Sequence, residues 1–537
     1  MIVFNYYSPD TWEGYVKNGL VRENTGVRLC QCLHINEDLM FNKLAKKDGA
    51  LYNLLKEKKY PFYVDRLQGG DYIQDYSYDK ELLDEYRKIL GDKFWGFQMH
   101  EWMSNYSYDL NVKLGDIPEE EWTEENIEKA IYKMFPGKEL YLESMTLSEM
   151  VAAGKPKNFD EFYKNITELY KKRIEEVGDI IPCDSFALAY DFEFSAGSKR
   201  ICPEVGWQIT NGRIQVCYAR GMTRKKGRSF GVYYETWGGD PLSSCTYCDG
   251  KNEWGVDENS EVPFKPYGPN GGSSRSLQKR VFLYAYLSNA EFLSEEWGGY
   301  NPFNNTEDFE LSPYGIVKRD FLDFCDKYSD VGEKLSPIAV VLPADTSVYY
   351  FNGDDNRILH YDVFDEKMNA ARRGVNEIFT TAAEKIGNEY KTFKNYKYAD
   401  AVDILNRDEE MLDGYKYLID FSGDEDFKGI HNNTIEIKDL KEKLCETLPC
   451  NVEGDIHWLV NQCTSGGYYL TIFNNNGVNR TVAEGEKVID GSDVTVSLTF
   501  KNGTKPILLE GDTELLTDGN KYRLTIKGGE IAFIKFQ

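Results

Sequence analysis

Short apolar runs alternate with amphipathic helical patterns from about residue 26 to residue 335. Each run is bounded by polar or turn-forming residues, which is typical of strands. The expected strands are residues 26–35, 61–67, 94–102, 185–194, 200–208, 230–239 and 290–299.

The helices expected between these strands carry the usual start and stop residues. Asp79 is placed to cap a helix that ends at Gly91, a residue type favoured just past a helix. Ser312 followed by Pro313 is the favoured order at the start of a later helix. Strand and helix alternating over this length predict a parallel sheet.

The parallel sheet could be open and doubly wound, or closed into a barrel. No G-x-G-x-x-G or Walker A sequence follows any expected strand, so the usual nucleotide sites of the open fold are absent from the sequence. Polar and acidic residues follow nearly every strand, and a closed barrel gathers all those ends around one mouth. We therefore expect a (β/α)8 TIM barrel over residues 1–335.

The pattern changes after residue 335. An apolar strand at 336–344, helical patterns and a second strand near 415–423 predict a small α/β domain over residues 336–432. Short alternating strands with turn signals follow, including GYYLTIFNNNGV and EIAFIKF. They predict a C-terminal β-sandwich over residues 433–537.

Composition and charge narrow the class of partner. The formal net charge of −26 argues against nucleic acid, whose binding needs clustered Lys and Arg. The chain has 38 Tyr, 29 Phe and 9 Trp, and aromatic planes beside carboxylates suit a carbohydrate cleft. The start lacks a secretory pattern and no apolar run approaches the ~20 residues that cross a bilayer, so we expect a cytoplasmic protein without a membrane partner.

Cysteine and histidine usage give little sign of a metal. The 11 Cys are odd in number and scattered, as in a reduced protein. Cys245 and Cys248 form the one tight pair, which could be half a zinc site or a strained disulfide. No second pair or nearby His completes a tetrahedral set, so a plain loop is favoured there. Only 5 His occur, without H-x-H or H-E-x-x-H spacing, which argues against a metal-dependent hydrolase. We expect no metal and no cofactor.

Carboxylates after several expected strands point to glycosidic bond cleavage. That reaction needs two carboxyl groups facing each other across the sugar, one as acid and one as nucleophile or base. In a barrel they should come from the ends of different strands, and a solvated loop is the alternative for each one alone. The candidates are Glu101, Asp191, Glu193, Glu204, Glu235, Glu295 and Glu296.

The sequence Glu296-Trp297-Gly298 resembles the ending of the seventh barrel strand in clan A glycoside hydrolases, where that Glu is the nucleophile. The three-part layout is similar to bacterial β-galactosidases with a barrel, a glutamine-amidotransferase-like trimerisation domain and a C-terminal β-domain. The resemblance implies a carbohydrate substrate and a homo-oligomer. No Cys lies between Cys325 and Cys445, so the middle domain lacks the thiol for amidotransferase chemistry.

The chain departs from clan A at the acid/base. There that residue follows Asn as Asn-Glu on the fourth strand, and no such pair ends an expected strand here. Glu193 occupies the expected position and Glu204 competes with it, so both stay open. Because successive strand side chains point to opposite faces, only one of Glu295 and Glu296 can face the barrel axis, and we expect Glu296.

The sequence thus predicts a retaining glycosidase that acts on an oligo- or polysaccharide, with Glu296 as nucleophile and Glu193 or Glu204 as acid/base. A non-catalytic carbohydrate-binding protein on a barrel is the alternative. A Ser-His-Asp hydrolase is disfavoured by the lack of a G-x-S-x-G motif. The expected substrate-binding residues are Asp65, His100, Glu101, Trp102, Asp191, Glu235, Trp237, Glu295 and Trp297.

Overall fold

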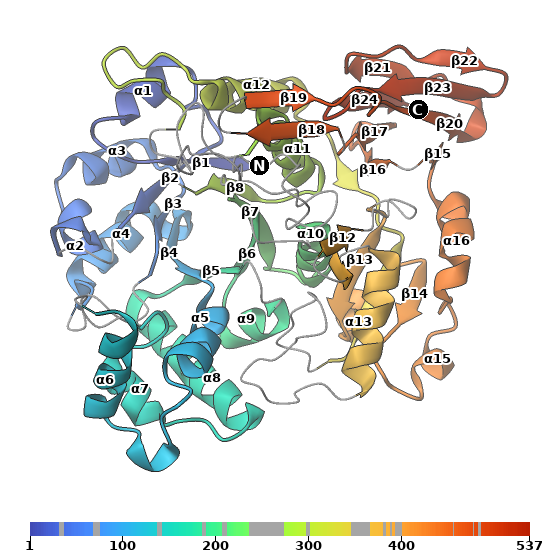
Figure 1. Cartoon of the computed structure of the whole chain (residues 1–537). Helices are drawn as coiled ribbons and strands as arrows, with labels where there is room; N and C mark the ends of the chain where they lie inside the picture. Colours follow the sequence, from blue (N-terminus) through green and yellow to red (C-terminus); the bar gives the residue numbers. More distant parts are fainter. Residues whose placement is uncertain are drawn as a thin grey trace.

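The computed structural model contains a closed barrel of eight parallel strands, followed by smaller sheets (Figure 1). The structure describes residues 1–31, 37–67, 76–136, 142–184, 189–206, 212–235, 273–296, 301–344, 366–379, 383–386, 389–392, 400–454, 456–475, 477–481 and 485–537. The barrel strands are β1 (Ile2–Tyr6), β2 (Thr25–Cys30), β3 (Phe62–Asp65), β4 (Phe94–His100), β5 (Ile180–Asp184), β6 (Arg200–Val205), β7 (Ser229–Tyr234) and β8 (Phe292–Glu295).

The barrel closes where β1 pairs with β8 in parallel, with Ile2 opposite Phe292 and Val3 opposite Leu293. Most strand residues are buried on both faces, as expected when helices cover the outside of a parallel sheet. The predicted TIM barrel is therefore confirmed, and all eight strand ends meet at one mouth.

Helices accompany the strands around the barrel (Figure 1). Asp79 Oδ1 accepts hydrogen bonds from Glu81 N and Leu82 N, and Ser312 Oγ accepts one from Gly315 N, so both predicted caps are confirmed. The helices of this part are α1 (Trp12–Lys17), α2 (Phe41–Leu44), α3 (Ala50–Lys58), α4 (Lys80–Leu90), α5 (Trp102–Tyr108), α6 (Glu124–Met134), α7 (Leu147–Ala153), α8 (Phe159–Val177), α9 (Tyr190–Ala196), α10 (Gly212–Met222), α11 (Arg275–Leu287) and α12 (Pro313–Lys327).

Two strand predictions were wrong, and both bear on the site. The first barrel strand is β1, which was not among the predicted strands. The fourth expected strand, residues 185–194, is wrong in its described part: β5 comes earlier, and Tyr190–Ala196 forms helix α9. Alternating aromatic and acidic residues in this segment suggested a strand, but Tyr190, Phe192, Glu193 and Phe194 are all buried on a helix. Tertiary packing here overrides a period-two pattern.

A small unit follows the barrel, coloured yellow to orange in Figure 1. Its three-stranded parallel sheet has the order β13-β10-β14. Its elements are β10 (Ile338–Leu342), α13 (Glu366–Ile378), β11 (Ala383–Ile386), β12 (Glu389–Thr392), β13 (Val402–Asn406), α14 (Glu409–Leu412), β14 (Tyr417–Asp420) and α15 (Phe427–Ile430).

Two antiparallel sheets form the last unit, as the predicted sandwich requires, with orders β15-β20-β23-β22 and β21-β24-β17-β16-β9. The edge strand β9 (Glu333–Lys334) comes from the segment between the barrel and β10, so the chain visits the last sheet before it enters the middle one. The predicted boundaries at 335 and 432 stay predictions. The remaining elements are α16 (Leu440–Thr447), β15 (Cys450–Glu453), β16 (His457–Gln462), β17 (Tyr468–Phe473), β18 (Val478–Thr481), β19 (Gly485–Val488), β20 (Val494–Phe500), β21 (Ile507–Glu510), β22 (Leu516–Asp518), β23 (Lys521–Ile526) and β24 (Ile531–Phe536).

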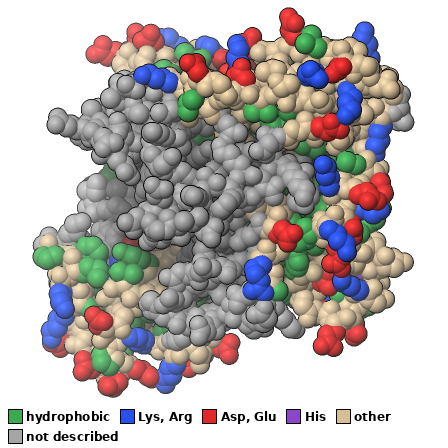
Figure 2. Space-filling model, turned by 45° about the vertical axis from the view of Figure 1, so that its right-hand side comes forward, with side chains coloured by type: hydrophobic (Ala, Val, Ile, Leu, Met, Phe, Trp, Pro, Cys, Tyr) green, Lys and Arg blue, Asp and Glu red, His purple; other side chains and the backbone are tan. Residues whose placement is uncertain are grey.

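The surface carries charge of both signs. Figure 2 shows Lys and Arg side chains interspersed with Asp and Glu on one face of the molecule.

Among the described residues, none of the helices combines the length and apolar character needed to cross a membrane. The described cysteines, including Cys183 and Cys202 inside the barrel, are all free thiols.

Candidate active site

The barrel interior is packed in layers below its mouth. Aromatic side chains of β1, β3, β4 and β8 fill the lower part, where the Phe4 ring lies 4.7 Å from Tyr63, 5.1 Å from Trp95 and 5.8 Å from Phe292. Tyr63 Oη and Ser294 Oγ are hydrogen-bonded at 2.6 Å above them. This floor is closely packed and apolar, so the groups above it are held against fixed neighbours.

A hydrogen-bonded polar layer lies at the ends of β2, β3, β4 and β7. Asp65 Oδ1 lies 2.8 Å from His100 Nε2, and Asp65 Oδ2 lies 3.3 Å from Arg28 Nη1. The Tyr233 hydroxyl donates to Asp65 Oδ2 at 3.4 Å. Burial opposes ionisation of Asp65, but the charges of Arg28 and His100 prevail and lower its pKa. Two of the predicted substrate-binding residues, Asp65 and His100, are therefore held together at the mouth.

Three buried glutamates meet above this layer. Glu204 lies in β6, Glu235 follows β7 and Glu296 follows β8, and one carboxylate oxygen from each lies within 4.8 Å of the others. All three are buried, with exposures of 4%, 6% and 5%. The structure thus brings two of the predicted catalytic residues, Glu204 and Glu296, to a separation that a sugar ring can bridge.

Arg66 completes the cluster, and the sequence analysis did not single it out. Its Nη2 donates to Glu296 Oε1 at 2.8 Å, and the charge of Glu296 raises the pKa of Arg66 against the effect of burial. Its backbone is left-handed, with φ of 62°. Such a conformation is uncommon for a residue other than glycine. An Arg after Asp65 was visible in the sequence, but its partner was not.

The pKa values of Glu204 and of its neighbour Glu101 are both raised. Burial first, then the charges of Glu101, Glu235 and Glu296, raise the pKa of Glu204 well above its usual range. Burial and the charge of Asp184 likewise raise the pKa of Glu101 to about 8. A carboxyl group that stays protonated near neutral pH can donate that proton to a leaving group.

Glu101 directly follows β4. It has a left-handed backbone with φ of 43°, and its N–H donates to Cys183 O at 2.7 Å. The charges that act on it include that of Glu296, so the predicted residue Glu101 faces the same cluster.

Glu295 points away from the cluster. Its Oε1 accepts from the Tyr314 hydroxyl at 2.5 Å, and its Oε2 accepts from Lys318 Nζ at 2.5 Å. Both partners belong to α12 on the outside of the barrel. The strand alternation at β8 therefore directs Glu295 outward and Glu296 to the mouth, and the predicted substrate contact of Glu295 is not supported.

Glu193 does not join the cluster. It lies on α9, where burial and the hydrogen-bonded carboxyl of Asp184 raise its pKa. Asp191, on the same helix, lies near enough to Arg228 for its charge to act on that guanidinium. Both residues lie on a helix, so the reason for expecting these two carboxylates at a strand end is gone.

Trp102, one of the predicted substrate-binding residues, is buried next to the mouth. The chain leaves β4 at His100 and begins α5 at Trp102, whose indole Nε1–H donates to Ser144 O at 2.6 Å. Its ring is 3% exposed and packs 5.7 Å from Tyr170, so it is a core residue. Trp237, Trp297, Gly298, Cys245 and Cys248 lie outside the described residues.

The resemblance placed the nucleophile after strand seven, whereas Glu296 follows β8. By strand number, the clan A positions after the fourth and seventh strands hold Glu101 and Glu235 instead. Sequence reasoning miscounted because it missed β1. The barrel mouth therefore contains two candidate pairs, Glu204 with Glu296 and Glu101 with Glu235.

Two groups of side chains at the mouth have the spacing of metal ligands. One is Glu204, Glu235 and Glu296, and the other is His100, Cys183 and Glu204. Oxygen ligands of the first kind suit a hard divalent cation. Arg66, however, already brings a positive charge to Glu296, which disfavours a second cation at the same oxygens.

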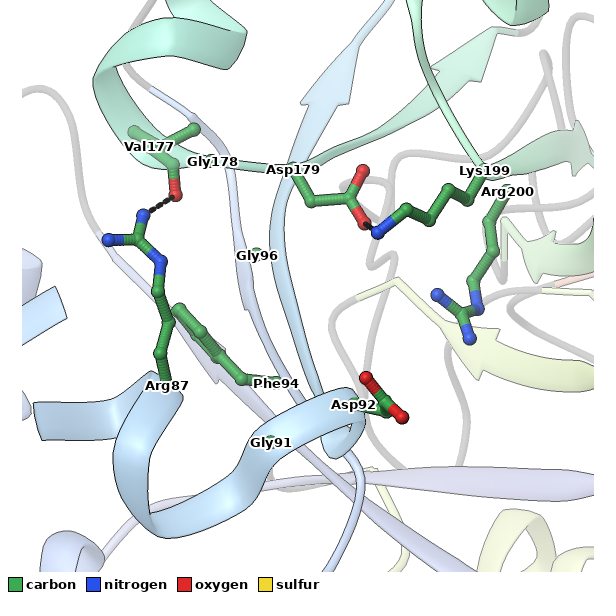
Figure 3. A pocket seen from close by; sticks show the side chains of 10 residues that line it. All are labelled: Arg87, Gly91, Asp92, Phe94, Gly96, Val177, Gly178, Asp179, Lys199 and Arg200. Carbon is green, nitrogen blue, oxygen red and sulfur yellow. Dashed lines mark hydrogen bonds and ion pairs between the residues drawn. The ribbon is translucent and has the colours of Figure 1, made fainter. Parts of the chain in front are cut away.

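A hollow at the opposite end of the barrel offers no comparable chemistry (Figure 3). It has a volume of about 320 Å³ and lies at the starts of β4, β5 and β6. Arg87 Nη2 donates to Val177 O at 2.8 Å, and Lys199 Nζ lies 3.9 Å from Asp179. Lys199 thus has a carboxylate neighbour in the hollow, while Arg87 and Arg200 pair with Asp84 and Glu291 outside its lining.

Comparison with known proteins gives resemblances in structure only. No protein-family model matches the chain, and no curated protein matches it in sequence. A β-galactosidase from the Antarctic haloarchaeon Halorubrum lacusprofundi has 10% identity and a TM-score of 0.42 over 100% of this chain and 99% of that one. A glycoside hydrolase family 30 subfamily 8 xylanase from Clostridium acetobutylicum has 7% identity and a TM-score of 0.34 over 100% and 95%.

An exo-β-1,4-mannosidase from Opitutaceae bacterium strain TAV5 has 9% identity and a TM-score of 0.34 over 88% of this chain and 83% of that one. All three TM-scores lie below 0.5, so these resemblances say nothing of which residues act. The function has to come from the side chains at the mouth.

Proposed function

We propose that this protein is a glycoside hydrolase that cleaves an oligo- or polysaccharide by a retaining mechanism, with Glu296 as nucleophile and Glu204 as acid/base. The observation that carries the proposal is the cluster of Glu204, Glu235 and Glu296 at the mouth, with carboxylate oxygens within 4.8 Å of each other. Retaining enzymes hold their two carboxyl groups about 5–5.5 Å apart, and inverting ones about 6.5–9.5 Å. The short separation supports retention.

The two roles are divided according to the neighbours of each carboxyl. Arg66 places a permanent positive charge against Glu296, the group that has to attack as an anion, and fixes its orientation. Glu204 has no described ion-pair partner, and its raised pKa keeps the proton that the leaving oxygen needs. Two carboxyl groups in one site with opposed environments are the arrangement that this chemistry requires.

The proposed reaction has two steps. Glu296 attacks the anomeric carbon while Glu204 protonates the departing oxygen, which gives a covalent glycosyl-enzyme. Glu204, now a carboxylate, then takes a proton from water as the water attacks the same carbon and releases Glu296. His100, whose Nε2 is fixed by Asp65, is placed to bind a sugar hydroxyl beside the pair.

Covalent labelling distinguishes the proposed pair from its rival, Glu101 with Glu235. A 2-deoxy-2-fluoroglycoside with a good leaving group traps the glycosyl-enzyme, and peptide mass spectrometry locates the label. We expect the label on Glu296. A label on Glu235 would transfer the nucleophile to β7 and the acid/base to Glu101. Sugar binding without label or turnover across a panel of aryl glycosides and glycans would favour a non-catalytic binding protein.

The homo-oligomer and its interface in the middle unit are also proposals. Light scattering tests them by measuring the mass of the protein in solution.

A further inference from the structure

A second hollow lies between the barrel and the two units that follow it. Its volume is about 510 Å³, and it lies beside the starts of β7 and β8, on the opposite side of the barrel from the mouth. Helix α10, strand β9 of the last sheet and strand β13 of the middle sheet all contribute to it. We call it the basic hollow; its charged lining residues are Arg220, Arg224, Arg228, Lys334, Glu333 and Asp403.

The basic hollow has an excess of positive charge. Four cationic side chains face two carboxylates, a difference of +2, in a chain whose formal net charge is −26. Figure 2 shows charges of both signs mixed on one face of the molecule, whereas cations outnumber carboxylates in the basic hollow. This excess indicates a place where an anion is stabilised.

The carboxylate of Asp403 already contacts two of the four cations. Arg220 Nε donates to Asp403 Oδ1 at 2.6 Å, and Arg224 Nη1 lies 3.6 Å from Asp403 Oδ2. The Tyr415 hydroxyl also donates to Asp403 Oδ2, at 2.8 Å. Asp403 thus contacts Arg220, Arg224 and Tyr415, and its charge reaches Lys334 without an ion pair.

Arg228 and Lys334 make no ion pair within the part of the chain that the structure describes. Arg228 Nη1 has only long contacts, 3.5 Å to Met222 O and 4.0 Å to Met411 Sδ. Lys334, which is 4% exposed, donates to Ser336 Oγ at 3.1 Å. Burial, followed by the charge of Arg220, lowers the pKa of Lys334 to about 8. A buried amine without an ion-pair partner is costly unless an anion joins it. The charges of Asp191 and Asp408 act on Arg228, which is partly exposed, without an ion pair among the described residues.

We propose that the basic hollow binds a small oxyanion of the phosphate class, held by Arg228 and Lys334 between the barrel and β9. Guanidinium N–H groups match the oxygens of phosphate in pairs, and a lysine ammonium adds a point charge. Because Arg228 belongs to the barrel and Lys334 to the last sheet, the bound anion joins two units of the chain. This inference does not depend on the proposed glycosidase activity.

The test is thermal unfolding and calorimetric titration of the full chain with inorganic phosphate, against sodium chloride at equal ionic strength. A ligand that binds the folded state alone raises the midpoint with its concentration. We expect inorganic phosphate to raise it and chloride to leave it unchanged. Glucose 6-phosphate is the second arm: a rise at lower concentration than inorganic phosphate identifies a phosphorylated sugar as the source, and an equal rise identifies the free ion. No rise with either compound overturns the proposal.

Variants locate the site. We expect Arg228→Gln and Lys334→Met each to weaken phosphate affinity at least tenfold. The matched control is Lys199→Ala in the hollow of Figure 3, whose cation has a carboxylate neighbour, and we expect its affinity to be unchanged. Equal affinity in Arg228→Gln and the unaltered chain refutes the site, even if Lys334→Met does not fold. Circular dichroism of each variant verifies that the fold is intact.

Discussion

Arg66 Nη2 lies 2.8 Å from Glu296 Oε1 and so connects the residue after β3 with the residue after β8 across the barrel mouth. The two strands are not neighbours in the sheet, and only the closed barrel brings their ends together. Arg66 reaches this position through a left-handed backbone at φ 62°. The ion pair is 33% exposed on the arginine side and 7% on the glutamate side, so water screens it only in part.

Replacing Glu296 tests the proposed nucleophile. We expect Glu296→Ala to lower kcat by several orders of magnitude while the fold is kept, because the covalent step is lost. Added azide should restore part of the turnover and give a glycosyl azide of inverted configuration, measured by NMR of the product. The comparison is Glu295→Ala, which leaves Lys318 buried without its carboxylate and should lower the free energy of unfolding by about 3–5 kcal/mol. If Glu295→Ala loses activity but keeps its stability, then Glu295, and not Glu296, would be the nucleophile.

Glu204 should control the basic side of the pH profile. Its pKa is raised by burial and by neighbouring carboxyls, so the proton needed for departure is present below that pKa and lost as the pH rises through it. We expect kcat/KM to fall on the basic side as a single proton is lost from Glu204. The Glu204→Gln variant should no longer show this fall. Substrates with a good leaving group, such as dinitrophenyl glycosides, should keep most of their first-step rate in Glu204→Gln. If kcat/KM of Glu204→Gln still falls at high pH, the group that loses the proton would be Glu101, whose pKa is raised to about 8.

The sequence predicted the barrel because strand and helix periods repeat locally, and it predicted the caps at Asp79 and Ser312 for the same reason. It also supplied Glu204, Glu235 and Glu296 as residues at strand ends. It missed Arg66, because an ion pair between residues 230 positions apart leaves no local signal. It misplaced Glu193, because aromatic alternation in residues 185–194 is compatible with either a strand or a buried helix, and packing decides between them.

Removal of divalent metal should leave turnover unchanged. Glu204, Glu235 and Glu296 have the spacing of cation ligands, yet Arg66 already occupies Glu296 with its own charge. Dialysis against EDTA, followed by assay with and without added Mg²⁺, Ca²⁺ and Mn²⁺, measures this directly. A loss of activity that one of these ions restores would show that the carboxylates act as ligands, and would replace the two-carboxylate mechanism.

Trp102 should contribute to stability and not to sugar binding. Trp102→Ala removes a buried ring and the donor to Ser144 O, so the free energy of unfolding should fall by about 3–5 kcal/mol. Trp102→Phe keeps most of the ring and loses the hydrogen bond, which should cost about 1 kcal/mol. Urea denaturation gives both values, and KM of the folded Trp102→Phe protein should stay within twofold. A large rise in KM with normal stability would return this ring to the sugar site.

A buried network joins all three units and should make the fold sensitive to acid. Arg213 Nε of α10 donates to Asp400 Oδ1 at 2.9 Å, and His457 Nε2 of β16 lies 2.5 Å from Asp400 Oδ2. The pKa of Asp400 is held well below its usual range, where the charges of Arg213 and His457 outweigh burial, and burial lowers the pKa of His457.

For both Asp400 and His457 the unfolded chain binds protons more readily than the folded one, so the stability of the fold decreases as the pH falls. The loss should begin below about pH 6.5, the ordinary pKa of histidine, and steepen near the ordinary pKa of aspartate. Asp400→Asn leaves Arg213 without its carboxylate, and we expect it to lower the free energy of unfolding by about 3–5 kcal/mol at pH 7. His457→Gln should flatten the slope of stability between about pH 6.5 and 5, as measured by urea denaturation across that range. An unchanged slope in His457→Gln would mean that acid sensitivity comes from other groups.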